Sequence, residues 1–181
     1  MGKDTATTTI PIVFGINEDP VRLCLVTRLA RPGGNATGIN FLTTEVAAKR
    51  LNLLRELVPA AAHVSVLVNP ANATSTESTL NDVSTAARAI GLQTQILNDG
   101  ADSEINAAFA ALMKSDGLLL AGDAFFSHRC VQLVHLATRH SISAIYSQRE
   151  FAEIGGLMSY GPNLADTFRQ VRCMCGKARP V

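Results

Sequence analysis

The chain has 181 residues, of which 47% are apolar and 17% charged, the composition of a globular protein rather than a disordered one. Sixteen Lys and Arg oppose fifteen Asp and Glu, and no basic block occurs, so a dedicated nucleic-acid surface is not expected. No apolar run is long enough to span a membrane, and the N-terminus lacks the apolar core of a signal peptide. As written, the chain is expected to stay in the cytoplasm.

Short apolar runs alternate with helical patterns along the chain. The runs predict strands at residues 10–14, 37–41, 64–68, 93–97, 118–121, 144–146 and 157–160. They are nearly continuous, which is typical of strands covered on both faces. Apolar residues at helical spacing predict helices at residues 47–58, 80–90 and 105–112. Because one strand–helix unit follows another, we expect an α/β fold with a parallel sheet and helices on both faces.

Several residues indicate where these helices begin and end. Pro59 and Gly91 stand where the first two helices should stop. Thr74 and Glu77 have the spacing of a capping box ahead of the second helix, and Asp102 can cap the third. Residues 172–181 have no apolar periodicity, so we expect a frayed tail and a last helix, beginning near residue 164, that is cut short.

Ligands of a parallel α/β sheet bind outside the carboxyl ends of the strands. Polar and aromatic residues follow those predicted ends, and we expect the ligand-binding residues among them: Asp19, Asn69, Thr74, Ser75, Asp123 and Tyr160. Such a set suits a small polar ligand with an apolar body.

Each of these residues also has a structural interpretation. The helix that starts near Thr74 offers N–H groups to a carboxylate or phosphate, but Thr74 and Ser75 can equally serve as simple helix caps. Asp123 can bind a ligand ammonium or cap the next helix. Tyr160 can flank the apolar body of a ligand or pack in the core.

The sequence contains no recognised catalytic or cofactor motif. Cys173 and Cys175 are too close together for the usual zinc spacing, and His128 and His135 have no acidic partner nearby in sequence. We therefore expect no metal, no cofactor and no catalytic residue, and we interpret the four cysteines as unpaired thiols.

Several segments match a known family in the expected order. They are IPIVF at 10–14, DPV at 19–21, LARPGGNATG at 29–38, KRL at 49–51, LRELVP at 54–59, VLVNPAN at 66–72, GDAFF at 122–126 and GGLMSYG at 155–161. Over residues 7–171 the chain resembles the ABC-transporter substrate-binding proteins, a family that includes tryptophan- and tyrosine-type binding proteins. The LARPGGNATG string is specific to this family.

The resemblance implies a Rossmann-like lobe of a type I periplasmic binding protein, in which two lobes close on a ligand. Members are exported, non-catalytic solute receptors that act in the periplasm and deliver their ligand to a membrane permease and its ATPase. Against that pattern, we expect a disordered N-terminus at residues 1–9 and a remnant of the first lobe at residues 10–41. The second, ligand-binding lobe is expected at residues 42–171, and an atypical tail at residues 172–181.

The leading hypothesis is a solute-binding component of an ABC uptake system that binds a small molecule, such as an aromatic amino acid, in a cleft between lobes. Relative to full members the chain looks truncated, so we expect impaired binding. The first-lobe remnant should leave a sheet edge exposed and available for self-association. The alternatives are a cytosolic α/β enzyme acting on a small polar substrate and a folded remnant without activity.

Overall fold

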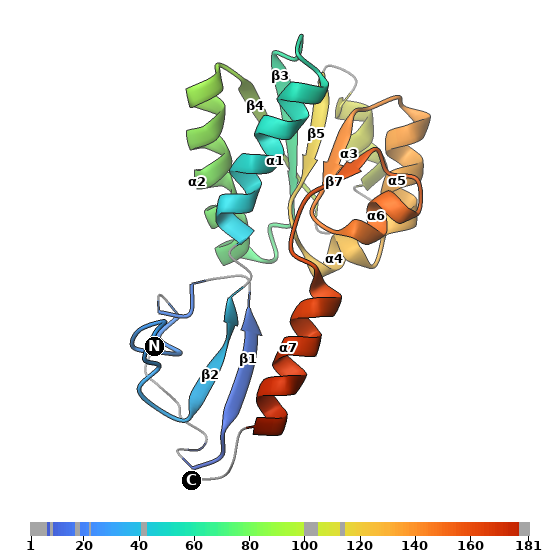
Figure 1. Ribbon diagram of the computed structural model, residues 1–181. Helices are drawn as coiled ribbons and strands as arrows, with labels where there is room; N and C mark the ends of the chain where they lie inside the picture. Colours follow the sequence, from blue (N-terminus) through green and yellow to red (C-terminus); the bar gives the residue numbers. More distant parts are fainter. Residues whose placement is uncertain are drawn as a thin grey trace. The chain divides into compact units, whose positions relative to one another are not determined.

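A computed structural model describes residues 7, 9–16, 19–21, 23–40, 43–99, 105–112 and 115–177 of the protein (Figure 1). The chain divides into two compact units. The first unit comprises residues 1–43 and 162–181, and the second unit comprises residues 44–161. Each unit is described by itself below.

The second unit is built around a parallel sheet. Its strands are β3 (His63–Val68), β4 (Gln93–Asn98), β5 (Gly117–Leu120), β6 (Ala144–Tyr146) and β7 (Met158–Ser159). They lie in the order β4-β3-β5-β6-β7, and every neighbouring pair is parallel. The helices are α1 (Thr43–Leu57), α2 (Ala73–Ile90), α3 (Ile105–Ala111), α4 (Ala124–Ser127), α5 (Cys130–Arg139) and α6 (Arg149–Glu153). The predicted parallel α/β architecture is confirmed.

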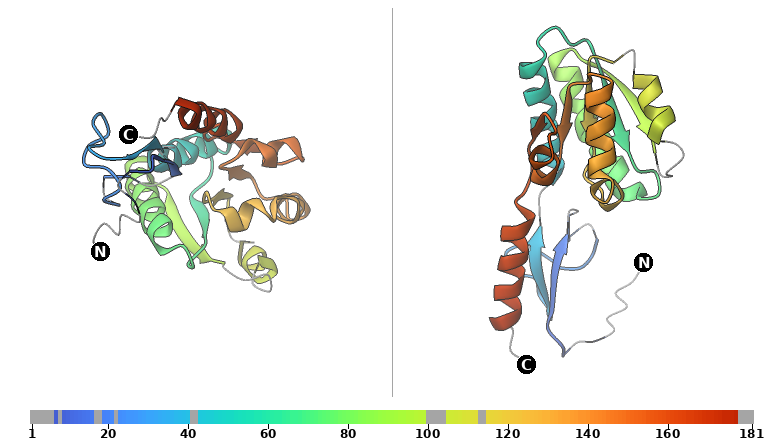
Figure 2. Two further views of the ribbon diagram at one scale, coloured as in Figure 1. Left: turned by 90° about the horizontal axis from the view of Figure 1, so that it is seen from below. Right: turned by 90° about the vertical axis from the view of Figure 1, so that its right-hand side faces the viewer.

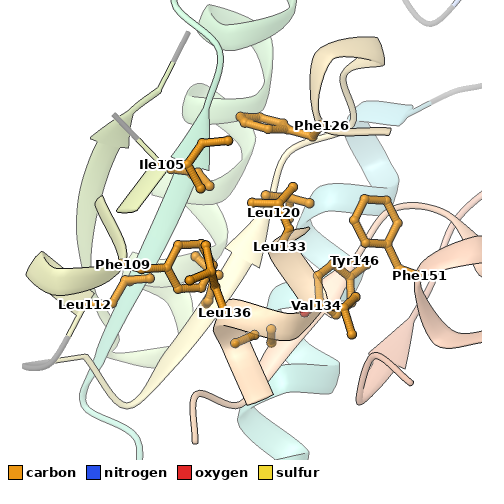
Figure 3. Close-up of a cluster of buried hydrophobic side chains, with 14 residues drawn as sticks. Ile105, Phe109, Leu112, Leu120, Phe126, Leu133, Val134, Leu136, Tyr146 and Phe151 are labelled. Carbon is orange, nitrogen blue, oxygen red and sulfur yellow. The ribbon is translucent and has the colours of Figure 1, made fainter. Parts of the chain in front are cut away.

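Helices cover both faces of this sheet (Figure 2). Side chains alternate along a strand, so Val64, Val66 and Val68 of β3 pack on the face covered by α1 and α2. Leu67 of the same strand packs on the opposite face, against α3 and α5. Figure 3 shows this second cluster, in which Leu120 and Tyr146 of the sheet meet side chains from α3, α5 and α6.

Strand β4 departs from the expected pattern. It forms one edge of the sheet, and all its residues except Leu97 are exposed, including Ile96 at 50%. The expectation that every strand is covered on both faces is therefore wrong for β4. Its sequence, QTQILN, is already richer in polar residues than the central strands, as edge strands usually are.

The helix ends were predicted with partial success. Helix α1 ends two residues before Pro59, and Gly91 caps α2 in the left-handed conformation, with φ 69°. The capping box at Thr74 and Glu77 is wrong, because Asn72 is the N-cap and its side chain accepts a hydrogen bond from the Ser75 N–H. Asp102 lies outside the described residues.

In the residues of the first unit that the structure describes, there are two parallel strands and one helix. Strand β1 (Ile12–Ile16) pairs with β2 (Ala36–Asn40), and both contact α7 (Leu164–Lys177). The strands begin within two residues of their predicted starts. Gly38 lies so close to Phe14 that a Cβ there would collide with the Phe14 carbonyl oxygen, which explains a glycine in mid-strand.

The C-terminal helix is longer than expected. Helix α7 continues to Lys177, so the prediction of a frayed tail is wrong for residues 172–177, and residues 178–181 lie outside the described part of the chain. Residues 162–171, which we assigned to the second lobe, fall in the first unit together with β1 and β2. Most of the N-terminal segment predicted to be disordered, residues 1–6 and 8, also lies outside the described residues.

Candidate functional site

The order of the strands points to one place on the sheet of the second unit. From β3 the chain crosses to β4 on one side and then returns to β5 on the other. The connections after β3 and β5 therefore leave in opposite directions. This makes the carboxyl ends of these two strands the switch point of the sheet, where open α/β sheets bind ligands. Asn69 directly follows β3, and Asp123 follows β5 by three residues.

Three hydrogen bonds hold the Asp123 carboxylate at this switch point. Its Oδ1 accepts from Asn69 Nδ2 at 2.9 Å and from the Phe125 N–H at 2.8 Å. Its Oδ2 accepts from Asn72 Nδ2 at 3.1 Å. A carboxylate has about four acceptor positions, so Asp123 keeps room for one more donor at Oδ2. It also caps α4, which confirms the capping interpretation of this residue, while its role in ligand binding stays a prediction.

The loop after β3 fixes the Asn69 side chain. Its Oδ1 accepts from the Ala71 N–H at 3.0 Å, so its Nδ2 must face Asp123. Its backbone oxygen accepts from Thr76 Oγ1 at 2.7 Å and from the Asn72 N–H at 3.1 Å. With 9% of its surface exposed, Asn69 is one of the few buried polar residues of the second unit. The loop is thus built to present an amide to the Asp123 carboxylate.

Asn72 links the start of α2 to the same carboxylate. Its Oδ1 accepts from the Ser75 N–H at 3.4 Å, its backbone oxygen accepts from the Thr76 N–H at 3.0 Å, and its Nδ2 donates to Asp123. Asn72 ends the VLVNPAN segment but is not among the ligand-binding residues expected from the sequence. The signal was available, because an Asn one residue before a helix is a preferred N-cap.

The structure brings together some of the predicted residues and not others. Asn69 and Asp123 are in direct contact, and Ser75 is connected to them through Asn72. Thr74 is exposed in the first turn of α2. Tyr160 follows β7 and is 44% exposed, and its N–H donates to the Tyr146 carbonyl. Asp19 lies in the first unit, where its Oδ1 accepts from the Val21 N–H at 2.8 Å.

An aromatic residue, Phe125, follows Asp123 by two residues, and its backbone N–H donates to the Asp123 carboxylate. Phe125 is half-buried, and the Arg129 guanidinium lies 3.8 Å from the centre of its ring. Arg129 Nη1 also donates to the Phe125 carbonyl at 3.2 Å. The site therefore combines a fixed carboxylate with two amides, and the ring of the nearby Phe125 packs against the core with the Arg129 cation over its face.

Arg50 is a feature of the second unit that the sequence analysis missed. It stands in the apolar stripe of α1 between Ala47 and Leu54, and only 2% of its surface is exposed. Its Nη1 donates to the carbonyl of Leu120, the last residue of β5, at 3.2 Å. Burial lowers the pKa of Arg50 to about 10, so it is still a cation at neutral pH. An arginine at an apolar position of a helical pattern was the signal for it.

Other kinds of site find little support in the described residues. Within them, no group of three or more His, Cys, Asp or Glu is arranged to hold a metal ion. Across the same residues, no helix is long and apolar enough to cross a membrane. A cavity of about 340 Å³ is lined by residues 137–138, 141–144, 146 and 155–157, which places it at the amino end of β6 and β7, away from Asp123.

Known proteins share this fold and these sequence features. A model of the family of ABC transporter substrate binding proteins matches residues 2–173. The tyrosine-binding protein of Clostridioides difficile (strain R20291) is 27% identical over 158 residues, which are 86% of this chain and 45% of that protein.

Solved structures agree with the sequence match. An ABC domain in complex with L-Trp from Streptococcus pneumonia is 20% identical, with a TM-score of 0.78 over 95% of this chain and 59% of that one. A substrate binding protein with adhesive properties from Clostridium difficile, in a ligand-free, open structure, is 25% identical, with a TM-score of 0.71 over 95% of this chain and 58% of that one.

These matches confirm the resemblance noted from the sequence and the type I periplasmic-binding fold that it implied. The chain spans about half the length of the relatives it matches. Because the family model covers nearly all of its residues, the chain belongs to the family of ABC transporter substrate-binding proteins.

Proposed function

We propose that this chain binds a small cationic or zwitterionic solute at Asp123 as the solute-binding component of an ABC uptake system. The observation that carries this proposal is the Asp123 carboxylate, which two amides and one backbone N–H orient at the switch point of the sheet. Its remaining acceptor position suits an ammonium, since hydrogen bonds between charged partners are the strong ones. We propose that Asn69, Thr74 and Ser75 contribute to the same site, since Asn69 contacts Asp123 and Ser75 is linked to it through Asn72.

Aromatic α-amino acids are the first ligands to test. One relative is a tyrosine-binding protein, and another was solved in complex with L-Trp. In this chain, Phe125 follows Asp123 by two residues, and we propose that its half-buried ring contacts the aromatic body of the ligand. We further propose that Tyr160 and, from the first unit, Asp19 contribute to the same ligand.

The partners and the location follow from the family. We propose that a membrane permease with its ATPase receives the solute, as expected for a substrate-binding protein of an ABC transporter. The two locations expected from sequence, the cytoplasm for the chain as written and the periplasm for full-length members, stay predictions.

Calorimetric titration of L-tryptophan, L-tyrosine and L-phenylalanine tests the proposal. We expect at least one to bind, and we expect Asp123→Asn to weaken that binding by about tenfold or more, because a hydrogen bond to a charged group contributes roughly 1.5–3 kcal/mol. Asp116→Asn is the matched control, since Asp116 precedes β5 and lies at the opposite edge of the sheet. Unchanged binding by Asp123→Asn would place the ligand elsewhere, and no binding at all would favour a folded remnant.

A further inference from the structure

Arg50 is a buried cation without a counter-ion among the described residues. Its Nη1 has the Leu120 carbonyl, but its Nε is buried without an acceptor. No carboxylate of the described residues forms an ion pair with it, and burial alone shifts its pKa. A guanidinium carries five N–H donors, so one carbonyl leaves most of its hydrogen-bonding capacity unused.

Such an arrangement is unfavourable for stability. Burying an ion costs several kcal/mol unless a partner of opposite charge and further hydrogen bonds compensate it. An apolar side chain such as Met would fit the stripe of α1 between Ala47 and Leu54 without that cost. The structural contribution of Arg50, one hydrogen bond to a strand end, is too small to explain its presence there.

The position of Arg50 suggests what its partner is. Leu120 ends β5 three residues before Asp123, so the guanidinium lies under the edge of the sheet that carries the candidate site. Helix α1 leads into β3, so its N-terminal half faces the same edge, and helical side chains point back toward the N-terminus. In these apolar surroundings the charge is poorly screened and acts over several ångströms.

The start of α2, for which the sequence left both anion binding and simple capping open, is partly occupied. The Ser75 N–H is bonded to Asn72 Oδ1, and the Thr76 N–H is bonded to the Asn72 carbonyl. The anionic end of a zwitterion therefore needs a stronger partner than this helix start alone.

We propose that the carboxylate of the bound ligand is the counter-ion of Arg50, so that the site selects zwitterions by binding the ammonium at Asp123 and the carboxylate at Arg50. This inference rests on the proposed function. It makes Arg50 a specificity-determining residue, and it predicts that a ligand must carry both charges to bind well.

Three ligands with the same indole ring allow the contributions of the ligand ammonium and the ligand carboxylate to be measured separately. L-tryptophan carries both, tryptamine lacks the carboxylate, and indole-3-propionate lacks the ammonium. Titrated into the unaltered chain, L-tryptophan should bind at least tenfold more tightly than tryptamine. Arg50→Met should weaken the binding of L-tryptophan and indole-3-propionate at least tenfold and leave the binding of tryptamine unchanged. Asp123→Asn should weaken the binding of L-tryptophan and tryptamine and leave that of indole-3-propionate unchanged.

Two further variants separate binding from folding. Lys49→Met removes an exposed cation from the neighbouring position of α1 and should leave all three affinities unchanged. Arg50→Lys keeps the charge and provides the test if Arg50→Met does not fold; it should retain a preference for L-tryptophan over tryptamine. Urea unfolding of Arg50→Met should show stability equal to or higher than that of the unaltered chain.

The outcomes distinguish this inference from the proposed function. Equal binding of L-tryptophan and tryptamine by the unaltered chain would overturn the role of Arg50 and leave Asp123 as the site. If Arg50→Met weakened the binding of all three ligands equally, Arg50 would serve only to support β5 through its hydrogen bond, and the inference would again be overturned. If none of the three ligands binds the unaltered chain, both proposals are wrong for this ring system.

Discussion

The two units of the chain differ in how completely they cover their sheets. In the second unit, β3, β5 and β6 are buried on both faces by two apolar clusters. In the first unit, no residue of β1 or β2 is fully buried, and the described buried apolar side chains are Val26 and Pro20. Parallel strands are normally covered on both faces, so only the second unit has the support that such a sheet requires.

The exposed apolar residues repeat this difference. Among the described residues, the first unit leaves eight large apolar side chains at 37% exposure or more: Ile10, Ile12, Val21, Leu23, Leu25, Leu29, Phe168 and Met174. The second unit, which is nearly twice as long, leaves six: Leu57, Ile96, Val131, Ile154, Leu157 and Tyr160. A two-stranded sheet of this kind is marginal in water by itself. We infer that the stability of the chain resides in the second unit, which also carries Asn69, Asp123 and Arg50.

Amide hydrogen exchange should show the largest contrast between the units. We expect amides of β3 and β5 to exchange only through opening that costs roughly 5 kcal/mol or more, and amides of β1 and β2 to exchange much faster. Sedimentation should detect self-association through the exposed sheet of the first unit. A monomer with uniformly slow exchange in both units would show that the first unit is as well supported as the second.

A matched pair of substitutions measures the same contrast in free energy of unfolding. Leu119→Ala in β5 removes a side chain that is 0% exposed and should destabilise the chain by about 2–5 kcal/mol. Leu29→Ala removes a side chain that is 64% exposed and should change stability by about 0.5 kcal/mol or less. Urea unfolding followed by circular dichroism gives both values. Similar losses would mean that Leu29 is buried in solution, for example in an assembly.

The response to alkali should depend on the core of the second unit. Burial raises the pKa of Tyr146 to about 12, above the value of about 10 for a tyrosine in the unfolded chain. The contribution of Tyr146 to the free energy of unfolding is therefore complete below pH 10. It is lost as the pH rises toward 12, because in this interval unfolding releases the phenol proton of Tyr146. The loss is about 2–3 kcal/mol over this interval.

Two variants isolate that contribution. Tyr146→Phe should lose less stability than the unaltered chain as the pH is raised through this interval. Tyr160→Phe leaves Tyr146 as the one remaining tyrosine, and its phenolate absorbance should then rise near pH 12 if the fold persists. Absorbance that rises near pH 10 in a folded Tyr160→Phe sample would contradict the burial of Tyr146.

The sequence by itself determined the local features and the family. Apolar runs and helical spacing fixed the strands and most helices, since a strand or helix leaves its period in neighbouring residues. The rule for carboxyl ends of strands then selected Asn69 and Asp123, and the structure joins these two side chains although 54 residues separate them. The family followed from short segments such as VLVNPAN and GDAFF, which hold these same residues.

Only the tertiary structure decided the rest, because it depends on contacts between distant parts of the chain. The order of the strands made β4 an exposed edge, and packing against β1 and β2 placed α7 in the first unit. Arg50 meets the Leu120 carbonyl across 70 residues, a contact that no local period records. Hydrophobic periodicity reports which face of a helix is buried, but a charge within that face acquires its partner only when the strands and helices pack together.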